Sequence, residues 1–239
     1  MMKEEIKILA LDSTAEVSTV AVCKGEKLLS EITINTGNTH SQALLPSVEQ
    51  ALRMAELTVE DIDVFACCTG PGSFTGVRIG VATIKGIAYG KNKPCISVST
   101  LEALAYNLSG FNGVICPVMN ARRSQLYNAL FECEGGKLAR ICPDRAISIS
   151  ELDDELSKSE RPIYLCGDGY DITQKGFKKT EICFVPVRYR YQSAYSVAQI
   201  AHKKFENNER LTDAELAPIY LRPSQAERER QAKIEGKNV

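Results

Sequence analysis

Apolar residues along the chain occur either in short continuous runs or at the spacing of one helical face. These two patterns divide the first part of the chain into predicted strands and helices. Short apolar runs predict three successive strands, at residues 6–11, 18–23 and 28–34. Residues 40–56 then carry apolar side chains at the spacing of one helical face, namely Leu44, Val48, Ala51, Leu52 and Ala55. A strand over residues 64–68, a corner rich in glycine, and a second helix that ends near residue 90 follow. The first unit therefore has the order strand, strand, strand, helix, strand.

The same order begins again near the middle of the chain. Apolar runs predict strands at residues 113–119, 126–133, 137–141, 163–166 and 183–185, and helices at residues 150–156 and 196–205. A repeated order of this kind predicts a duplicated α/β fold with a mixed sheet in each half. We expect an N-terminal subdomain at residues 1–108, a C-terminal subdomain at residues 109–222 and a charged tail at residues 223–239.

Two polar turns close the first strand of each predicted half. They are Asp12-Ser13-Thr14 and Asn120-Ala121-Arg122. The duplicated organisation resembles the actin, sugar-kinase and Hsp70 group, where nucleotide phosphates bind between the halves. That resemblance makes Asp12, Ser13 and Thr14 a vestigial phosphate turn, although an aspartate that closes a strand is also a common turn former.

Residues 69–80, with the sequence TGPGSFTGVRIG, form the most distinctive stretch. Its glycines allow a positive φ or a close approach of backbone, and the corner presents the free N–H groups of a helix start. Such a corner can bind an anion, but the glycine spacing alone favours a tight packing joint. The stretch is not a phosphate-binding P-loop, because no Gly-Lys-Ser/Thr ends it, and it lacks G-x-G-x-x-G.

Composition and charge narrow the class of protein. Hydrophobic residues make up 44% of the 239 residues and charged residues 25%, which is ordinary for a globular protein, and no apolar run reaches transmembrane length, so we expect no membrane contact. The odd number of scattered cysteines suits reduced thiols, so we expect a cytoplasmic protein. The nine cysteines contain no C-x-x-C pair, which favours reduced, buried thiols. The net charge of −1 gives no attraction to nucleic acid, so tRNA or other RNA would be contacted only indirectly, through another protein.

Four stretches of the chain resemble the bacterial TsaB (YeaZ) family. They are ILALDST from residue 8, HSQALLP from residue 40, the corner at residues 69–80, and PIYLR from residue 218. The third is long and specific, and the others support it. The resemblance implies an actin-like fold and a scaffold without chemistry of its own. It also implies binding to TsaD, the catalytic paralogue that attaches threonylcarbamoyl to adenosine in ANN-decoding tRNAs, and a role in an assembly with the ATPase TsaE.

Departures from the catalytic relatives support a subunit without enzymatic activity. Those relatives carry a His-Met-Glu-Gly-His motif whose two imidazoles bind a metal from one helix face. The matching residues here are Thr100 and Leu104, which are not competent ligands, so we expect no metal and no cofactor. Asn120 stands where the family usually has an aspartate, which weakens an independent site for magnesium and ATP.

Two enzymatic alternatives remain open from the sequence. One is an active ATP-dependent kinase or carbamoyltransferase of the same fold, which tight nucleotide binding by the pure protein would favour. The other is a peptidase, which needs an activated nucleophile and an oriented base. The chain offers only His40 and His202, and Ser73 does not lie in G-x-S-x-G. We interpret His40 as a helix-start residue and His202, beside two lysines, as solvated.

The two helices of the first unit are the predicted partner surface. The second helix has two apolar stripes, and a helix that covers one sheet needs only one. We expect the interface to contain Leu44, Val48, Leu52, Gly76, Val77, Gly80, Val81, Ile84, Ile87 and Ala88. A homodimer of the isolated chain and a heterodimer with TsaD would then use one patch and exclude each other. The alternative is that the second stripe packs on the first helix within one chain.

Overall fold

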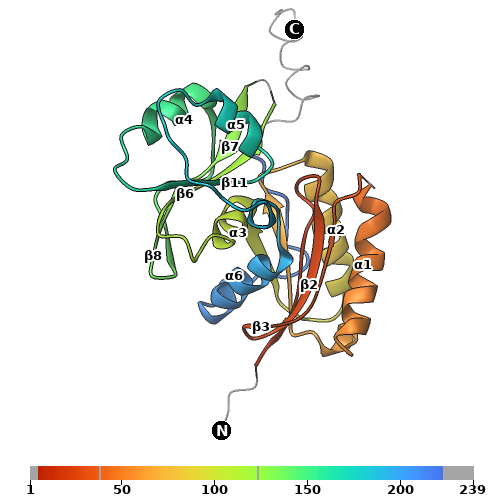
Figure 1. The fold of residues 1–239 in the computed structure, drawn as a ribbon. Helices are drawn as coiled ribbons and strands as arrows, with labels where there is room; N and C mark the ends of the chain where they lie inside the picture. Colours follow the sequence, from red (N-terminus) through yellow and green to blue (C-terminus); the bar gives the residue numbers. More distant parts are fainter. Residues whose placement is uncertain (1–4, 38, 123, 223–239) are drawn as a thin grey trace, which may run out of the picture.

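A computed structural model describes residues 5–37, 39–122 and 124–222, and its N-terminal half is built on one five-stranded sheet (Figure 1). The strands are β1 (Lys7–Asp12), β2 (Ser18–Lys24), β3 (Lys27–Ile34), β4 (Val64–Gly70) and β5 (Cys95–Ser99). Their order is β3-β2-β1-β4-β5, with β1, β2 and β3 antiparallel and β4 and β5 parallel to β1. The polar end of β1 is thereby placed beside the glycine corner that ends β4.

Helices cover both faces of this sheet (Figure 1). Leu9 and Leu11 of β1 face α1 (His40–Met54) and α2 (Phe74–Ala88), whereas Ile8 and Ala10 face α3 (Thr100–Tyr106) and α6 (Ala194–Glu206). Alternate residues of a strand point to opposite faces, so a continuous apolar run marks a strand that is buried on both sides. A short 3-10 helix, η1 (Val59–Asp61), precedes β4.

The second half repeats this plan around β6 (Gly113–Asn120). β6 pairs with two antiparallel strands, β7 (Gln125–Asn128) and β8 (Phe131–Glu134), and with the parallel strand β11 (Ile163–Cys166). The sheet is extended by β9 (Lys137–Arg140) beside β8 and by β10 (Arg145–Ser148) beside β7. The remaining helices are α4 (Ile149–Leu156) and α5 (Tyr170–Gly176), and η2 (Val187–Tyr189) precedes α6. The expected duplicated α/β fold with a mixed sheet in each half is confirmed.

A proline explains why the strand expected at residues 126–133 is divided into β7 and β8. The pairing with β6 keeps one register on both sides of the break, with Gly113 opposite Cys133 and Val118 opposite Asn128. This register places Pro117 opposite Ala129, where the ladder stops. Proline has no N–H to donate, and the side-chain amide of Asn128 donates instead to the carbonyl oxygens of Pro117 and Ala129, at 3.1 and 2.9 Å.

Other expectations for the second half need correction. The strand expected at residues 183–185 is wrong, because only one bridge joins Cys183 to Tyr164, and Pro186 then removes a donor. The sequence pattern also missed β10 and α5, which are short elements without a clear period.

The last described helix returns to the first sheet. Ala194, Val197, Ala198, Ile200 and Ala201 of α6 join the core that contains Ile8 and Ala10 of β1. The expected division assigned this helix to a C-terminal subdomain at residues 109–222, whereas its apolar face packs on the N-terminal sheet. The subdomain boundaries stay a prediction, and the expected tail at residues 223–239 lies outside the described residues.

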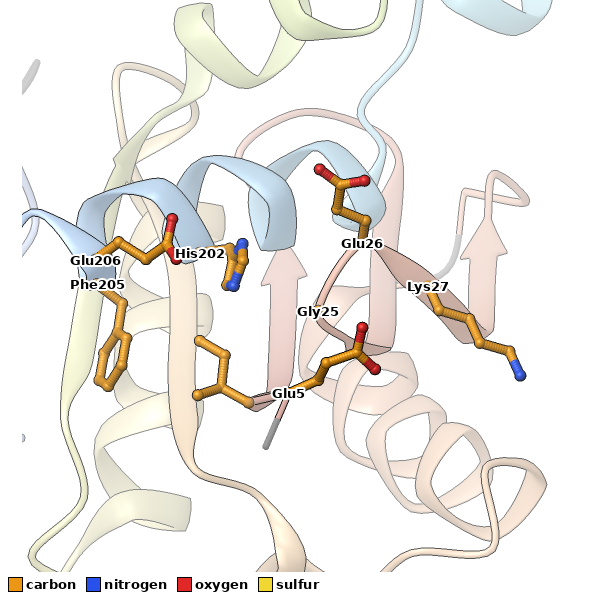
Figure 2. Close-up of a pocket in the computed structure, with 8 residues that line it drawn as sticks. Glu5, Gly25, Glu26, Lys27, His202, Phe205 and Glu206 are labelled. Carbon is orange, nitrogen blue, oxygen red and sulfur yellow. The ribbon is translucent and has the colours of Figure 1, made fainter. Parts of the chain in front are cut away.

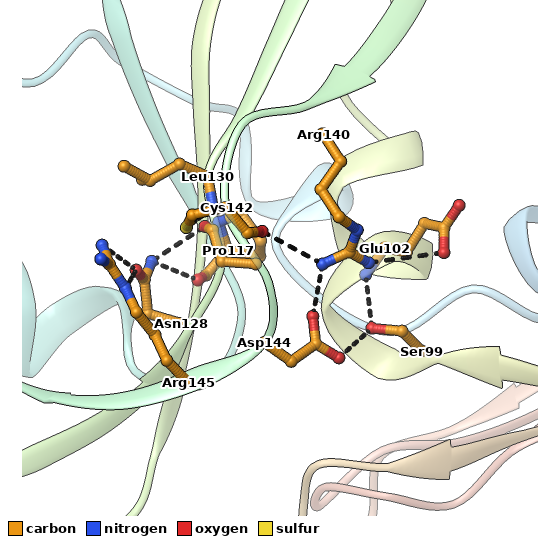
Figure 3. Close-up of polar contacts among 10 residues, drawn as sticks. Ser99, Glu102, Pro117, Asn128, Leu130, Arg140, Cys142, Asp144 and Arg145 are labelled. Atoms are coloured by element: carbon orange, nitrogen blue, oxygen red, sulfur yellow. Dashed lines mark hydrogen bonds and ion pairs between the residues drawn. The ribbon is translucent and has the colours of Figure 1, made fainter. Parts of the chain in front are cut away.

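A polar network ties the two halves together beside α3 (Figure 3). Arg140 of β9 pairs with Asp144 at 2.6 Å and with Glu102 of α3 at 3.5 Å, and Ser99, at the end of β5, donates to Asp144 at 2.6 Å. The Arg140 guanidinium also lies 4.5 Å from the centre of the Phe131 ring. Because Ser99 and Glu102 belong to the first half and Arg140 and Asp144 to the second, this network helps to fix their relative position.

Candidate functional site

The glycine corner is a packing joint between α2 and the turn after β1. The side chain of Ser73 caps α2 by accepting from the Gly76 N–H at 3.3 Å, and the Ser73 N–H donates to the Thr14 carbonyl at 2.7 Å. A Cβ on Gly72 would overlap the Thr14 carbonyl oxygen, and a Cβ on Gly76 would overlap that of Ser13. The glycines are therefore required because two backbone segments touch, as the spacing had favoured.

His40, the first residue of α1, closes the other side of this turn. Its Nε2 lies 2.6 Å from the Ala15 carbonyl oxygen, so that nitrogen carries a proton and donates. The Ser13 hydroxyl donates to the Gly76 carbonyl at 2.9 Å from within the same contact. The turn thus positions the starts of α1 and α2 together, and His40 is a helix-start residue, as interpreted from the sequence.

The candidate phosphate turn is buried. Asp12, Ser13 and Thr14 are at most 1% exposed, and the segments that cover them are the glycine corner and the start of α1. The residues expected to face a phosphate therefore face the protein's own backbone. The structure brings the three residues together, and other segments of the same chain occupy the space beside their turn.

Asp12 holds the turn through one carboxylate oxygen and leaves the other unsatisfied. Its Oδ1 accepts from the Thr14 N–H at 2.8 Å and from the Thr14 hydroxyl at 2.7 Å. Within the described residues, Oδ2 has no hydrogen-bond partner that meets normal geometry. Burial raises the pKa of Asp12, and the hydrogen bonds from Thr14 oppose that rise only in part. The group is thus a turn former held in an apolar setting.

The second polar turn lies across from the first, as expected. Ala15 packs into the hydrophobic core of the second half, which Ala121 also contacts. The Asn120 N–H donates to the Asp168 carboxylate at 3.2 Å. Surrounding protein raises the pKa of Asp168 to about 6, although the residue reaches solvent, and the nearby charge of Glu16 acts in the same direction. Glu16 of the first half therefore lies near Asp168 of the second, and sequence reasoning had named neither carboxylate as a site residue.

The positions that match the metal motif of catalytic relatives contain no ligands here. Thr100 is fully buried at the start of α3, and Leu104 belongs to the core of the second half. The Leu104 carbonyl accepts from the Cys166 thiol at 3.4 Å, and Glu102 pairs with Arg140. Among the residues that the structure describes, no group of three or more His, Cys, Asp or Glu side chains is placed to hold a metal ion.

Most residues expected at the partner interface lie in the core of this chain, which corrects that assignment. The side chains of Leu44, Val48, Leu52, Val77, Val81, Ile84 and Ala88 are at most 6% exposed and pack between the helices and the sheet. Gly76 and Gly80 face Ser13. Only Ile87, with partial exposure, stays available. A helix that covers a sheet buries its most apolar stripe there, so a charge at Val81 would unfold the domain rather than test an interface.

The outward stripe of α2 is small and weakly polar. It consists of Thr75, Arg78, Ala82, Gly86 and Tyr89, with Ile79 and Ile87 half-buried along its edge. The one charged residue of this stripe is Arg78, whose Nε donates to the Tyr220 hydroxyl at 2.7 Å. The Tyr220 ring in turn stacks on Phe74. The neighbouring helix α1 adds Leu45, which is 57% exposed. Sequence reasoning had not named Ala82. Its spacing of four from Gly86, opposite the buried stripe, is the pattern that could have identified this outward face.

A separate pocket of about 480 Å³ lies at the far end of α6 from this surface (Figure 2). Carboxylates of Glu5, Glu26 and Glu206 line it, together with His202 and Lys27. His202 is therefore a pocket residue near carboxylates, and no serine or cysteine lines this pocket beside it. Nothing in the pocket resembles the arrangement of nucleophile and base that a peptidase needs.

No helix among residues 5–37, 39–122 and 124–222 is both long and apolar enough to cross a bilayer.

Comparisons with known proteins agree with this geometry. A family model described as "TsaD: tRNA N6-adenosine threonylcarbamoyltransferase" matches residues 27–229. The TsaB protein of Bacillus subtilis, named "tRNA threonylcarbamoyladenosine biosynthesis protein TsaB", is 32% identical over 67% of this chain and 70% of its own length. The Haemophilus influenzae protein of the same name is 26% identical over 92% of this chain and 94% of its own.

A solved structure described as YeaZ from Pseudomonas aeruginosa shares the fold, with a TM-score of 0.75 and 21% sequence identity over 90% of this chain and all of that one. The sequence likeness and the family model cover most of the chain, and the fold agrees with both. The chain belongs to the TsaB (YeaZ) family.

Proposed function

We propose that this chain is the non-catalytic partner subunit of TsaD in the formation of threonylcarbamoyladenosine on ANN-decoding tRNAs. Two relatives, one of them matched over 94% of its own length, carry the name of that biosynthetic pathway. In this proposal TsaD performs the transfer in the cytoplasm, TsaE joins the assembly, and this chain binds TsaD through the outward face of α1 and α2. The isolated chain pairs with a second copy through the same face.

The observation that carries the proposal is the outward stripe of α2. The residues Ala82 and Gly86 present little side chain, so another helix can approach closely there. Half-buried Ile79 and Ile87 and exposed Leu45 supply apolar area at its edges. A stripe of small residues with apolar edges suits a helix-to-helix interface.

The second observation in favour of a scaffold is that the turn after β1 is closed. Its backbone is packed against the glycine corner, and Thr100 and Leu104 replace the metal-binding pair of catalytic relatives. The turn acts here as the support that orients α1 and α2. An independent nucleotide-dependent enzyme has no comparable observation in its favour.

The variant Ala82→Arg tests the surface. A long cation in the centre of the outward stripe should lower the affinity for TsaD at least about tenfold, because its charge would be buried without a partner. Ala139→Arg is the matched control, since Ala139 is exposed on β9 in the second sheet. Co-purification with TsaD and sedimentation of the isolated chain are the measurements, and circular dichroism verifies folding.

The two pairings should also compete. Addition of TsaD to the isolated chain should convert the homodimer into a one-to-one heterodimer. A complex in which TsaD and a second copy of this chain bind the same α1 and α2 surface should not form. A folded Ala82→Arg variant with wild-type affinity for TsaD would show that the partner binds elsewhere.

A further inference from the structure

The segment at residues 184–191 crosses from the second half toward α6, and its backbone is firmly held. The Gly167 N–H donates to the Arg190 carbonyl at 2.6 Å, and the Asn107 amide donates to the Tyr191 carbonyl at 2.7 Å. Val185, within the segment, is fully buried, and η2 gives the centre of the segment a regular turn. The segment is therefore a fixed support and not a loose loop.

Several side chains of this fixed segment point to solvent. Phe184 is 74% exposed and Val187 is 58% exposed, so two large apolar side chains that are close in sequence reach solvent. Arg188 is also exposed, and Tyr191 is 38% exposed. Aromatic and basic residues thus alternate on one short stretch of surface.

The two arginines lie close to aromatic rings and, among the described residues, pair with no carboxylate, while Arg190 Nε donates to the Val185 carbonyl at 2.8 Å. The Arg188 guanidinium lies 4.7 Å from the centre of the Tyr189 ring, and that of Arg190 lies 3.7 Å from Tyr170 and 5.9 Å from Phe184. Within the part of the chain that the structure describes, neither forms an ion pair. By contrast, carboxylates hold Arg140, Arg145 and Arg161.

We propose that residues 184–191 form an RNA contact that stacks an unpaired base on Phe184 and binds backbone phosphates with Arg188 and Arg190. Unpaired bases stack on exposed aromatic rings and on guanidinium planes, and phosphates are bound by arginines that have no carboxylate partner. The rigid backbone lowers the entropic cost of such a contact.

This chemistry favours RNA over a protein partner. Phe184 is a single exposed ring, and such a ring suits the face of a single base. The net charge of −1 agrees with one local contact that adds to the phosphate contacts of a partner. The identity of the RNA rests on the proposed function, in which TsaD brings the tRNA to the assembly.

The test uses the full chain, alone and assembled with TsaD. The probes are a short unpaired RNA, a fully paired RNA of equal length and an ANN-decoding tRNA, measured by fluorescence anisotropy over a range of salt concentrations. The variants are Phe184→Ala and Arg188→Ala. The matched control is Arg210→Ala, because Arg210 is also exposed and lies 3.8 Å from the ring centre of Phe205, on the first half.

We expect Phe184→Ala to weaken binding of unpaired RNA and tRNA about fivefold or more, as the loss of one stacked base predicts. Arg188→Ala should lower the slope of log affinity against log salt by about one, as the loss of one phosphate contact predicts. Arg210→Ala should change neither quantity. All three variants should retain TsaD, because the segment lies outside the α1 and α2 surface.

Wild-type RNA affinity and salt slope in both folded variants would overturn the inference. Loss of a protein partner with unchanged RNA binding would also overturn it, and would identify the segment as a protein-binding surface. Failure of the wild-type chain to bind TsaD would refute the proposed function alone, because RNA binding by the isolated chain still tests residues 184–191.

Discussion

Three glycines on α2 provide a graded test of the packing joint at the turn after β1. A Cβ added at Gly76 would overlap the Ser13 carbonyl oxygen, and one at Gly80 would lie 2.6 Å from the Ser13 hydroxyl oxygen. A Cβ at Gly86 would meet nothing within 4 Å. The substitutions Gly76→Ala, Gly80→Ala and Gly86→Ala therefore make the same chemical change on one helix in three different surroundings.

The expected free energies of unfolding follow from two opposing effects. Replacement of glycine by alanine inside a helix stabilises by about 1 kcal/mol. Overpacking costs about 1–3 kcal/mol, and the upper end applies at Gly76 because the opposing atom is backbone and cannot rotate away. We expect a net loss of about 2 kcal/mol for Gly76→Ala, a smaller loss for Gly80→Ala, and a gain of up to about 1 kcal/mol for Gly86→Ala.

Urea denaturation of the isolated chain, followed by circular dichroism, measures these differences. Thermal unfolding should show Gly76→Ala melting about 4–8 °C below the wild type. Both measurements need two protein concentrations, since the proposed self-association would contribute to the apparent stability. If Gly76→Ala is as stable as Gly86→Ala, the contact between α2 and the turn is not the reason for glycine at position 76.

Two further substitutions test buried polar groups. Because burial raises the pKa of Asp12, its favourable contribution to folding is complete below the unfolded pKa near 3.8 and is lost as the pH rises through the folded pKa. Asp12→Asn keeps an acceptor for Thr14, so its stability relative to the wild type should rise from acidic to neutral pH in urea denaturation, and a pH-independent difference would contradict this reasoning. Asn128→Ala removes the partner of two carbonyl groups and of Arg145, whose Nε and Nη2 donate to Asn128 at 3.2 and 3.1 Å (Figure 3). It should cost about 2 kcal/mol in the same assay, and Asn112→Ala, on an exposed asparagine, should cost less.

Local patterns were sufficient for the elements with a strong period. The runs before Asp12 and before Gly70 predicted buried strands, and the spacing of Leu44, Val48 and Leu52 predicted α1. The two halves became visible from the repeated order of these elements. Such features depend on neighbours in sequence, so the chain itself specifies them.

Short elements and the broken strand depended on contacts between distant residues. The break between β7 and β8 arises because Pro117 lies opposite Ala129, a pairing that exists only once the sheet has formed. The return of α6 to the first sheet likewise follows from which apolar face is left uncovered. Neither relation has a signal within a short window of sequence.

The sequence by itself determined the duplicated α/β order, the two facing polar turns and the resemblance to the TsaB family, because periodicity and motif spacing are properties of the chain. It also predicted two apolar stripes on α2. Only the tertiary structure decided that Val77, Val81 and Ile84 face the sheet, which leaves Ala82 and Gly86 outward. The physical reason is that burial is set by what covers each face, and the approach of Ser13 to Gly76 fixes the rotation of α2.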